Sequence, residues 1–204
     1  SKTISIIIAE DEAIIRLDLK ESLEAEGYAV VGETGRGDEA IDLVRMLEPD
    51  LVILDIKMPG MNGIDAARVI SEQGLAAVIL LTAFSQQDLI QEASNAGVLA
   101  YLVKPFQRSD LVPSIELALG RFKEISDLKQ ETLMLRESLQ TRKLVDRAKG
   151  LLIDNYGLKE SDAYRYLQKK AMEDRTTMKA VAEDILTDTS RLDSDPPEKM
   201  DKKS

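Results

Sequence analysis

The 204-residue chain contains no cysteine, no histidine and no tryptophan, and only 4% of its residues are aromatic. The absence of cysteine excludes disulfides and thiolate chemistry. The absence of histidine removes the usual neutral-pH acid–base group and the commonest protein ligand for metals. Any metal must therefore bind to oxygen atoms, which favours Mg²⁺ or Ca²⁺ over zinc. The sequence also has no apolar run of about eighteen residues and no recognisable signal peptide. It therefore predicts a cytoplasmic protein with no membrane partner.

Acidic residues outnumber basic ones, but the excess is confined to the first part of the chain. The net charge is −10 overall, −11 for residues 1–120 and +2 for residues 121–187. The two parts differ in electrostatic character, which predicts different partners for them. The length allows one domain of ordinary size and a smaller one.

Five short apolar runs alternate with helical patterns along the first 120 residues. The predicted strands are residues 4–9, 28–33, 50–54, 76–81 and 100–103, and the predicted helices are 12–26, 38–47, 63–72, 86–96 and a fifth from 109. The third run is continuously apolar, as expected of a central parallel strand that is buried on both faces. This alternation predicts an α/β doubly wound, five-stranded parallel sheet with helices on both faces.

Polar residues follow the predicted strands: Glu10 and Asp11 the first, Asp55 the third, Thr82 the fourth and Lys104 the fifth. We expect them to meet, because the carboxyl ends of parallel strands lie at one edge of the sheet. Three close carboxylates repel each other and need a cation, and oxygen ligands suit Mg²⁺. The sequence thus predicts a magnesium site formed by Glu10, Asp11 and Asp55. Asp55 would be the nucleophile for a phosphoryl group, whose oxygens Mg²⁺ and Lys104 neutralise and Thr82 hydrogen-bonds.

These residues resemble the receiver domain of two-component response regulators over about residues 3–122. The matching motifs are Glu10-Asp11, Asp55 before Met58-Pro59-Gly60-Met61-Asn62-Gly63, Thr82-Ala83, and Lys104-Pro105-Phe106. The resemblance implies a flavodoxin-like fold, Mg²⁺ as cofactor, and Asp55 as the phosphoacceptor of a cognate histidine kinase. It also implies that Tyr101 is a switch aromatic that swings inward when Thr82 moves to the phosphoryl group. Glu10 departs from the family, in which Asp is common, but its longer carboxylate still fits a metal.

A competing interpretation is a phosphatase of the haloacid dehalogenase type, which also uses an aspartate after a strand. That mechanism requires a second acid two residues later, where this chain has Lys57.

A long helix is predicted to link the two parts of the chain. Ile125, Leu128, Thr132, Leu135 and Leu139 alternate at spacings of three and four, which is typical of a coiled-coil seam. The seam covers only about two heptads and would be marginal alone. Two interpretations remain open: the stripe packs against the chain itself, or two copies pair when their receivers are brought together by phosphorylation.

Residues 138–187 predict a small three-helix domain. The first helix should end at Gly157, the second should span 159–173, and Thr176 or Thr177 should cap the third. Ten basic and six acidic residues lie between positions 138 and 180. Such a surplus is often only a solvated helix face, but in so acidic a chain it indicates an anionic partner.

This part resembles the ANTAR domain, a three-helix RNA-binding module of transcription antiterminators, over about residues 137–187. The resemblance rests on Leu139, Arg142, the run from Val145 to Leu152, Ala163-Tyr164, Leu167, Ala171-Met172, Arg175, Val181-Ala182 and Ile185-Leu186. It departs at Gln168, where Arg is frequent, and at Met178, where Leu is. A receiver followed by ANTAR resembles the actinobacterial antitermination regulators, which are not enzymes. The resemblance implies binding to paired RNA hairpins in nascent transcripts, one per protomer.

As RNA contacts we predict Arg142, Arg147 and Lys149 on the first helix and Arg175, which we expect to open the third. The predicted domains are a receiver at 1–122, a coiled-coil linker helix at 123–137, ANTAR at 138–187 and a disordered tail at 188–204. One alternative is a DNA-binding regulator with a helix-turn-helix. Against it, the third helix carries one base and three acids between 179 and 188. The other is a protein-only signalling adaptor.

Overall fold

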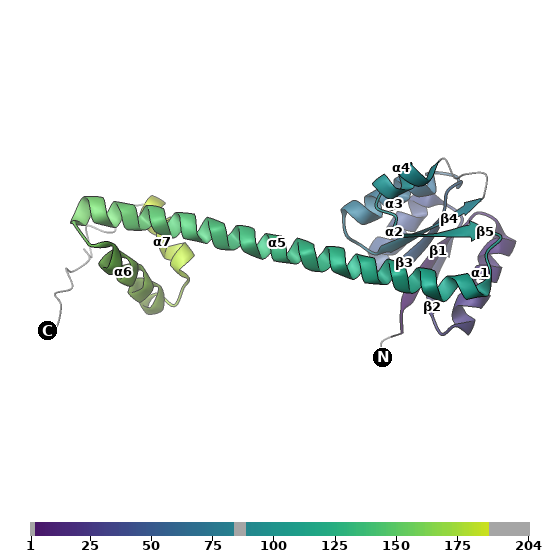
Figure 1. Ribbon diagram of the computed structural model, residues 1–204, viewed down its shortest axis with the longest axis horizontal. Helices are drawn as coiled ribbons and strands as arrows, with labels where there is room; N and C mark the ends of the chain where they lie inside the picture. The colour runs from purple at the N-terminus through teal and green to yellow at the C-terminus, as the bar shows by residue number, and fades with distance from the viewer. Residues whose placement is uncertain (1–2, 84–88, 188–204) are drawn as a thin grey trace. The chain divides into compact units, whose positions relative to one another are not determined.

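The computed structural model describes residues 3–83 and 89–187, so the predicted disordered tail lies outside the described residues. The chain divides into two compact units, residues 1–128 and 129–204. The predicted fold class is confirmed (Figure 1): a five-stranded parallel sheet with flanking helices is followed in the chain by a long helix and further helices. Among the described residues, no helix combines the length and the apolar character that crossing a bilayer requires.

The first unit alternates strands and helices as predicted. The strands are β1 (Ser5–Ala9), β2 (Ala29–Thr34), β3 (Leu51–Asp55), β4 (Ala77–Ala83) and β5 (Ala100–Lys104). The helices are α1 (Ala13–Ala25), α2 (Gly37–Leu47), α3 (Gly63–Glu72), α4 (Ile90–Asn95) and α5, which begins at Arg108. The strand order is β2-β1-β3-β4-β5, and all neighbouring strands are parallel. The start of the helix predicted at 86–96 lies outside the described residues.

Each face of the sheet has its own apolar core because successive side chains of a strand point to opposite faces. Ile7, Val52 and Val78 belong to a cluster with residues of α2, α3 and α4. Ile8 and Ile53 belong to the cluster on the other face, with residues of α1 and of the first turns of α5. All five residues of β3 are buried, which explains why the four residues before Asp55 are continuously apolar.

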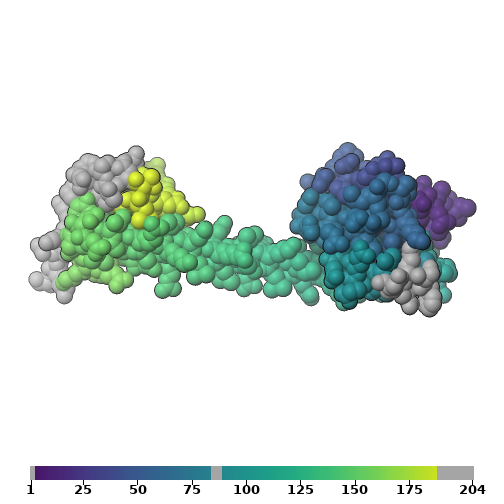
Figure 2. Space-filling model, turned by 90° about the horizontal axis from the view of Figure 1, so that it is seen from above, coloured from purple at the N-terminus to yellow at the C-terminus, as the bar shows by residue number. Residues whose placement is uncertain are grey.

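Helix α5 runs without interruption from Arg108 to Tyr156. It joins the predicted fifth receiver helix, the linker and the first helix of the C-terminal domain, because nothing between Pro113 and Gly157 terminates it. Every residue from 123 to 140 is exposed, and Figure 2 shows the surface of this stretch in green. The exposed fractions of Ile125, Leu135 and Leu139 are 42%, 59% and 59%. These values argue against packing of the stripe on the part of the chain that the structure describes.

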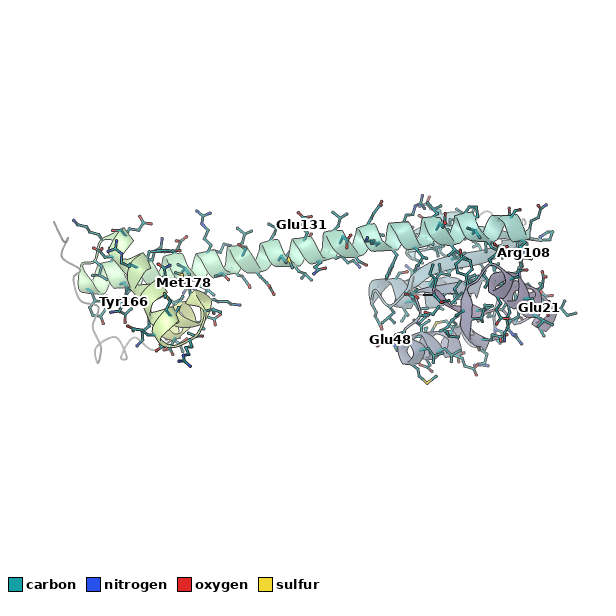
Figure 3. All side chains as sticks on the ribbon, turned by 90° about the horizontal axis from the view of Figure 1, so that it is seen from below. Glu21, Glu48, Arg108, Glu131, Tyr166 and Met178 are labelled. Carbon is teal, nitrogen blue, oxygen red and sulfur yellow. The ribbon has the colours of Figure 1, made fainter. Side chains whose placement is uncertain are left out.

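The second unit packs the end of α5 against α6 (Glu160–Glu173) and α7 (Met178–Thr187). Its core consists of apolar residues from all three helices, with Tyr166 and Met178, labelled in Figure 3, partly buried against it. Helix α5 ends before Gly157 as predicted, since Gly157 adopts a left-handed φ of 65°. Thr177 is the residue that caps α7, because its Oγ1 accepts a hydrogen bond from the Ala180 N–H at 3.1 Å.

Candidate functional sites

Three carboxylates and one ammonium group meet at the carboxyl edge of the sheet. Glu10, next to β1, is fully buried, and Asp55, at the end of β3, is 4% exposed. Asp11 is exposed beside them. One carboxylate oxygen of each of these three residues lies within 4.8 Å of the others. The Nζ of Lys104, at the end of β5, lies 3.0 Å from Asp55 Oδ1 and 3.1 Å from Glu10 Oε2.

A tight turn after β3 fixes the position of Asp55. The Gly63 N–H donates to the Ile56 carbonyl oxygen at 2.8 Å, and a Cβ on Gly63 would lie only 1.9 Å from the Asp55 carbonyl oxygen. Position 63 must therefore be glycine if the chain is to approach Asp55 so closely. Asn62 then caps α3, since its Oδ1 accepts from the Asp65 N–H at 2.9 Å. The loop thus holds the Asp55 backbone in place while its carboxylate faces the other acids.

Burial and mutual charge shift the protonation of this cluster. Burial raises the pKa of Glu10, the Glu12 N–H that donates to it lowers the pKa in part, and the charge of Asp55 raises it again. Burial likewise raises the pKa of Asp55, and the hydrogen bond from Lys104 offsets part of that rise. Burial alone would lower the pKa of Lys104, but its bonds to Asp55 and Glu10 outweigh burial and raise it. Lys104 therefore stays charged and holds the acids together.

The residues present fit a divalent cation of the magnesium type. Hard carboxylate oxygens from three residues converge closely enough to share one ion. One lysine between two of the acids leaves the cluster of Glu10, Asp11 and Asp55 with excess negative charge. The oxygen donors that such an ion requires are thus present at this edge of the sheet. A hollow of about 540 Å³ opens beside Asp11, and Lys57 and Asn62 are among the residues that line it.

Thr82 and Tyr101 lie on β4 and β5, the two strands that follow β3 in the sheet. Thr82, on β4, is 3% exposed, and its hydroxyl donates to the Ala83 carbonyl oxygen at 3.1 Å. Tyr101, on β5, is partly buried, and its hydroxyl donates to the Ile90 carbonyl oxygen of α4 at 3.3 Å. Burial raises the pKa of Tyr101. The ring therefore links β5 to α4, while the predicted switch roles of both residues stay predictions.

The four predicted RNA contacts differ in what surrounds them. Arg142 and Arg147 are exposed on α5. The Lys149 side chain is only 14% exposed, and its Nζ lies 2.8 Å from Asp146 Oδ1 and 3.0 Å from Glu160 Oε1. These two bonds raise the pKa of Lys149. Lys149 thus connects α5 to α6, which sequence spacing did not indicate because Glu160 becomes its neighbour only when the helices pack.

Arg175 lies at the end of α6 and does not open α7 as predicted. Its φ is 49°, in the left-handed region. The Thr176 N–H donates to the Ala171 carbonyl oxygen at 2.9 Å and the Arg175 N–H to that of Met172 at 3.3 Å. This is the Schellman pattern of a helix end, in which glycine is usual. The prediction was wrong because Arg175 and Thr176 form the capping pattern that ends α6, so α7 can begin only after Thr177.

A second hollow, of about 470 Å³, lies on the C-terminal unit and was not predicted. Its lining residues are Lys149, Glu160, Ser161, Tyr164, Arg165 and Gln168. Tyr164 is 47% exposed. An aromatic ring beside basic groups is a chemistry that suits unstacked RNA bases.

Comparison with known proteins matches a family to each part of the chain. The response regulator receiver domain family matches residues 6–116, and the ANTAR domain family matches residues 134–186. The transcriptional regulatory protein PdtaR of Mycobacterium tuberculosis H37Rv is 56% identical over 181 residues, which cover 89% of this chain and 88% of PdtaR. The chemotaxis protein CheY of Thermotoga maritima is 40% identical over 111 residues, which cover 54% of this chain and 92% of CheY.

Solved structures support the same assignment for the first unit. The signal receiver domain of a modulated diguanylate cyclase from Desulfovibrio desulfuricans superimposes with a TM-score of 0.56 at 28% identity, covering 60% of this chain and 98% of that one. The chain therefore belongs to the two-component response regulators, with an N-terminal receiver domain and a C-terminal ANTAR domain of the RNA-binding antitermination type.

Proposed function

We propose that a histidine kinase phosphorylates this response regulator on Asp55, with Mg²⁺ held by Glu10, Asp11 and Asp55. The observation that carries the proposal is the convergence of these three carboxylates within 4.8 Å, with Lys104 Nζ 3.0 Å from Asp55 Oδ1. A buried aspartate in contact with a lysine, next to an exposed acid, Asp11, that lines a hollow, has the arrangement that a phosphoryl acceptor needs.

In the transfer step, an oxygen of the Asp55 carboxylate attacks the phosphorus of a phosphohistidine on the kinase. The new bond joins oxygen to phosphorus, and the bond from phosphorus to the imidazole nitrogen breaks. The imidazole leaves with the electron pair and is then protonated. When bound, Mg²⁺ supplies positive charge to the phosphoryl oxygens. Lys104 stays in contact with the acceptor, and Thr82 exchanges its bond to the Ala83 carbonyl for one to a phosphoryl oxygen.

We infer that phosphorylation leads to a homodimer. The phosphoryl group adds a charge of about −1.5 to −2 beside Lys104. The movement of Thr82 toward it would vacate space on β4 for Tyr101, whose hydroxyl now contacts Ile90 of α4. The surface formed by α4 and β5 would change, and the exposed stripe of α5 would pair with that of a second copy.

The proposed output is binding to paired RNA hairpins in nascent transcripts, one per protomer, which prevents a terminator from forming. The proposed domain boundaries are 1–122, 123–137 and 138–187. Arg142, Arg147, Lys149 and Arg175 are the proposed contacts, and their charges would meet RNA phosphates. Recognition of hairpin loops with splayed bases is the usual route to RNA sequence specificity.

Phosphorylation is tested by incubating the full chain with Mg²⁺ and labelled acetyl phosphate. Asp55→Asn should abolish acid-labile labelling, because an amide is a poor nucleophile. Asp42→Asn on α2, an exposed acid away from the site, is the matched control and should label as the wild type does. Equal labelling of the Asp55→Asn variant would refute the assignment.

RNA binding is tested by salt-titrated gel shifts with hairpin RNA and with duplex DNA. Arg142→Ala should weaken hairpin binding and lower the slope of log affinity against log salt by about one per lost phosphate contact. Arg45→Ala removes the same charge from an exposed position of the receiver and should change neither quantity. Hairpin affinity that is unchanged in Arg142→Ala, or no stronger than duplex DNA affinity in the wild type, would contradict the proposal.

A further inference from the structure

The middle of α5 is a helix surface without cover from the rest of the described chain. All residues from 123 to 140 are exposed, and Figure 3 shows their side chains, Glu131 among them, projecting outward from the helix. In a heptad written abcdefg, the apolar seam occupies the two core positions. Ile125, Thr132 and Leu139 fall at a, and Leu128 and Leu135 fall at d.

The positions that flank this seam carry charges of alternating sign. Glu124 and Glu131 fall at g, whereas Lys129 and Arg136 fall at e. Within the described residues, these four side chains form no ion pair with the rest of the chain. Their charges are therefore available to a partner helix, and in coiled coils the e and g residues decide partner and orientation.

We propose that the partner of this stripe is a second copy of the same chain, aligned parallel and in register. In that arrangement each g residue faces the e residue five positions later on the other helix. Glu124 then faces Lys129 of the partner subunit, and Glu131 faces Arg136 of the partner subunit. Symmetry repeats both pairs, so all four flanking contacts join opposite charges.

The antiparallel arrangement is opposed by the same four residues. There g residues face g residues and e residues face e residues. When the core residues from 125 to 135 of the two copies are paired, Glu131 meets Glu131 of the partner subunit and Lys129 meets Lys129 of the partner subunit. Every flanking contact between two charged residues would then join like charges, which destabilises it by about as much as opposite charges stabilise it. The charge pattern therefore selects orientation, and the apolar seam alone would not.

This inference rests on the proposed phosphorylation-dependent dimer and states its geometry. Parallel pairing makes both ANTAR domains follow the same end of the coil, as simultaneous binding of two hairpins on one transcript requires. The seam is short, and a polar residue, Thr132, occupies its central a position, which lowers its stability. Pairing thus depends on the receivers, and the charges determine which way the helices align.

The test exchanges the charges at e and g in the full chain. The swapped variant combines Glu124→Lys, Glu131→Lys, Lys129→Glu and Arg136→Glu. In a parallel arrangement, the homodimer of the swapped chain is as stable as the wild-type homodimer, because all its e and g contacts still join opposite charges. A mixed dimer of wild-type and swapped chains brings only like charges together. In an antiparallel dimer the reverse holds, and wild-type and swapped chains prefer each other. The control variant, Lys123→Glu with Glu137→Lys, exchanges charges at two f positions that lie outside the seam.

Isotope-labelled wild type, unlabelled variant and a beryllium fluoride phosphoryl mimic are mixed at low salt and weighed by native mass spectrometry. We expect the mixed dimer with the swapped variant to be roughly tenfold to a hundredfold weaker than either homodimer. The control variant should mix at random with the wild type. If the swapped variant mixes with the wild type preferentially or at random, parallel pairing is refuted but the dimer proposal stands. If the wild type stays monomeric with the mimic, both parallel pairing and the phosphorylation-dependent dimer are refuted. Phosphorylation of Asp55 is tested separately by the labelling experiment.

Discussion

Removing Lys104 should make the receiver domain depend on a divalent cation for its stability. In Lys104→Met the ammonium group that lies 3.0 Å from Asp55 and 3.1 Å from Glu10 is replaced by an apolar chain of similar length. Glu10 is fully buried and Asp55 is 4% exposed, so neither carboxylate can recover its lost partner from bulk water. The variant must keep two uncompensated charges or protonate one of them.

The two routes, keeping the uncompensated charges or protonating one carboxylate, cost a similar free energy of unfolding. Breaking a buried ion pair by removing one partner costs about 3–5 kcal/mol. Lys104 keeps 17% side-chain exposure, which places the cost toward the lower end. Protonating one carboxyl at pH 7, about three pH units above its ordinary pKa, costs at most about 4 kcal/mol. We therefore expect the free energy of unfolding to fall by about 2–4 kcal/mol at pH 7 when EDTA removes metal.

The assay is chemical denaturation of the full chain followed by circular dichroism, in EDTA and in saturating Mg²⁺. The deficit in EDTA should shrink from pH 7 to pH 5, because without Lys104 the pKa of Asp55 and of Glu10 rises further and the folded state binds a proton more tightly. Mg²⁺ should stabilise the variant more than the wild type, because metal binding to the folded state adds to its stability. The control is Lys57→Met, an exposed neighbour that should change little. An unaltered Lys104→Met in EDTA, or an equal loss in Lys57→Met, would refute the reasoning.

Three other substitutions follow from the described structure. Burial raises the pKa of Asp55, so the folded state holds the Asp55 proton more tightly than the unfolded state does. The free energy of unfolding should therefore fall as pH rises from about 4 to 7. Asp55→Asn should flatten this pH dependence in EDTA, and an unchanged slope would contradict the assignment. Thr132→Ile should strengthen the phosphoryl-dependent dimer by roughly tenfold in sedimentation, since each copy buries about one more methylene-sized group; an unchanged constant would remove Thr132 from the seam. Arg175→Gly should stabilise the C-terminal unit by about 0.5–1 kcal/mol in thermal unfolding, because glycine accepts the left-handed φ of 49°, while it weakens RNA binding; a loss of stability would show that the Arg175 side chain supports the helix end.

The receiver site could be predicted from sequence because topology alone brings its residues together. Once the apolar runs form one parallel sheet, residues at the carboxyl ends of β1, β3, β4 and β5 must lie at the same edge. Glu10, Asp55 and Lys104 needed no knowledge of side-chain packing to be found. The direction of the Thr82 hydroxyl, toward the Ala83 carbonyl oxygen, could not be predicted, because a rotatable group follows local contacts that spacing does not define.

The C-terminal unit was harder to predict because its surface depends on how α6 meets α5. Arg142 and Lys149 are seven residues apart, which puts them on roughly one face of an isolated helix. This spacing could not show that Glu160, eleven residues after Lys149, would lie against that face at 3.0 Å. Arg175 was misplaced for a different reason, because nothing in its side chain indicates the left-handed conformation that glycine normally adopts.

Lys104 and Lys149 each bridge two acids, yet the consequences for ligand binding differ. In the proposed transfer the phosphoryl group becomes attached to Asp55, so Lys104 keeps both carboxylate partners and gains a contact to the phosphoryl oxygens. At the RNA surface a phosphate would compete with Asp146 and Glu160 for Lys149, and the bonds at 2.8 Å and 3.0 Å would weaken as the bond to the phosphate forms. Within the described residues, Arg142 and Arg147 form no such close ion pair that a phosphate would have to replace. Arg142 should therefore contribute more RNA affinity than Lys149, and a loss on Lys149→Ala would partly reflect the weakened packing between α5 and α6.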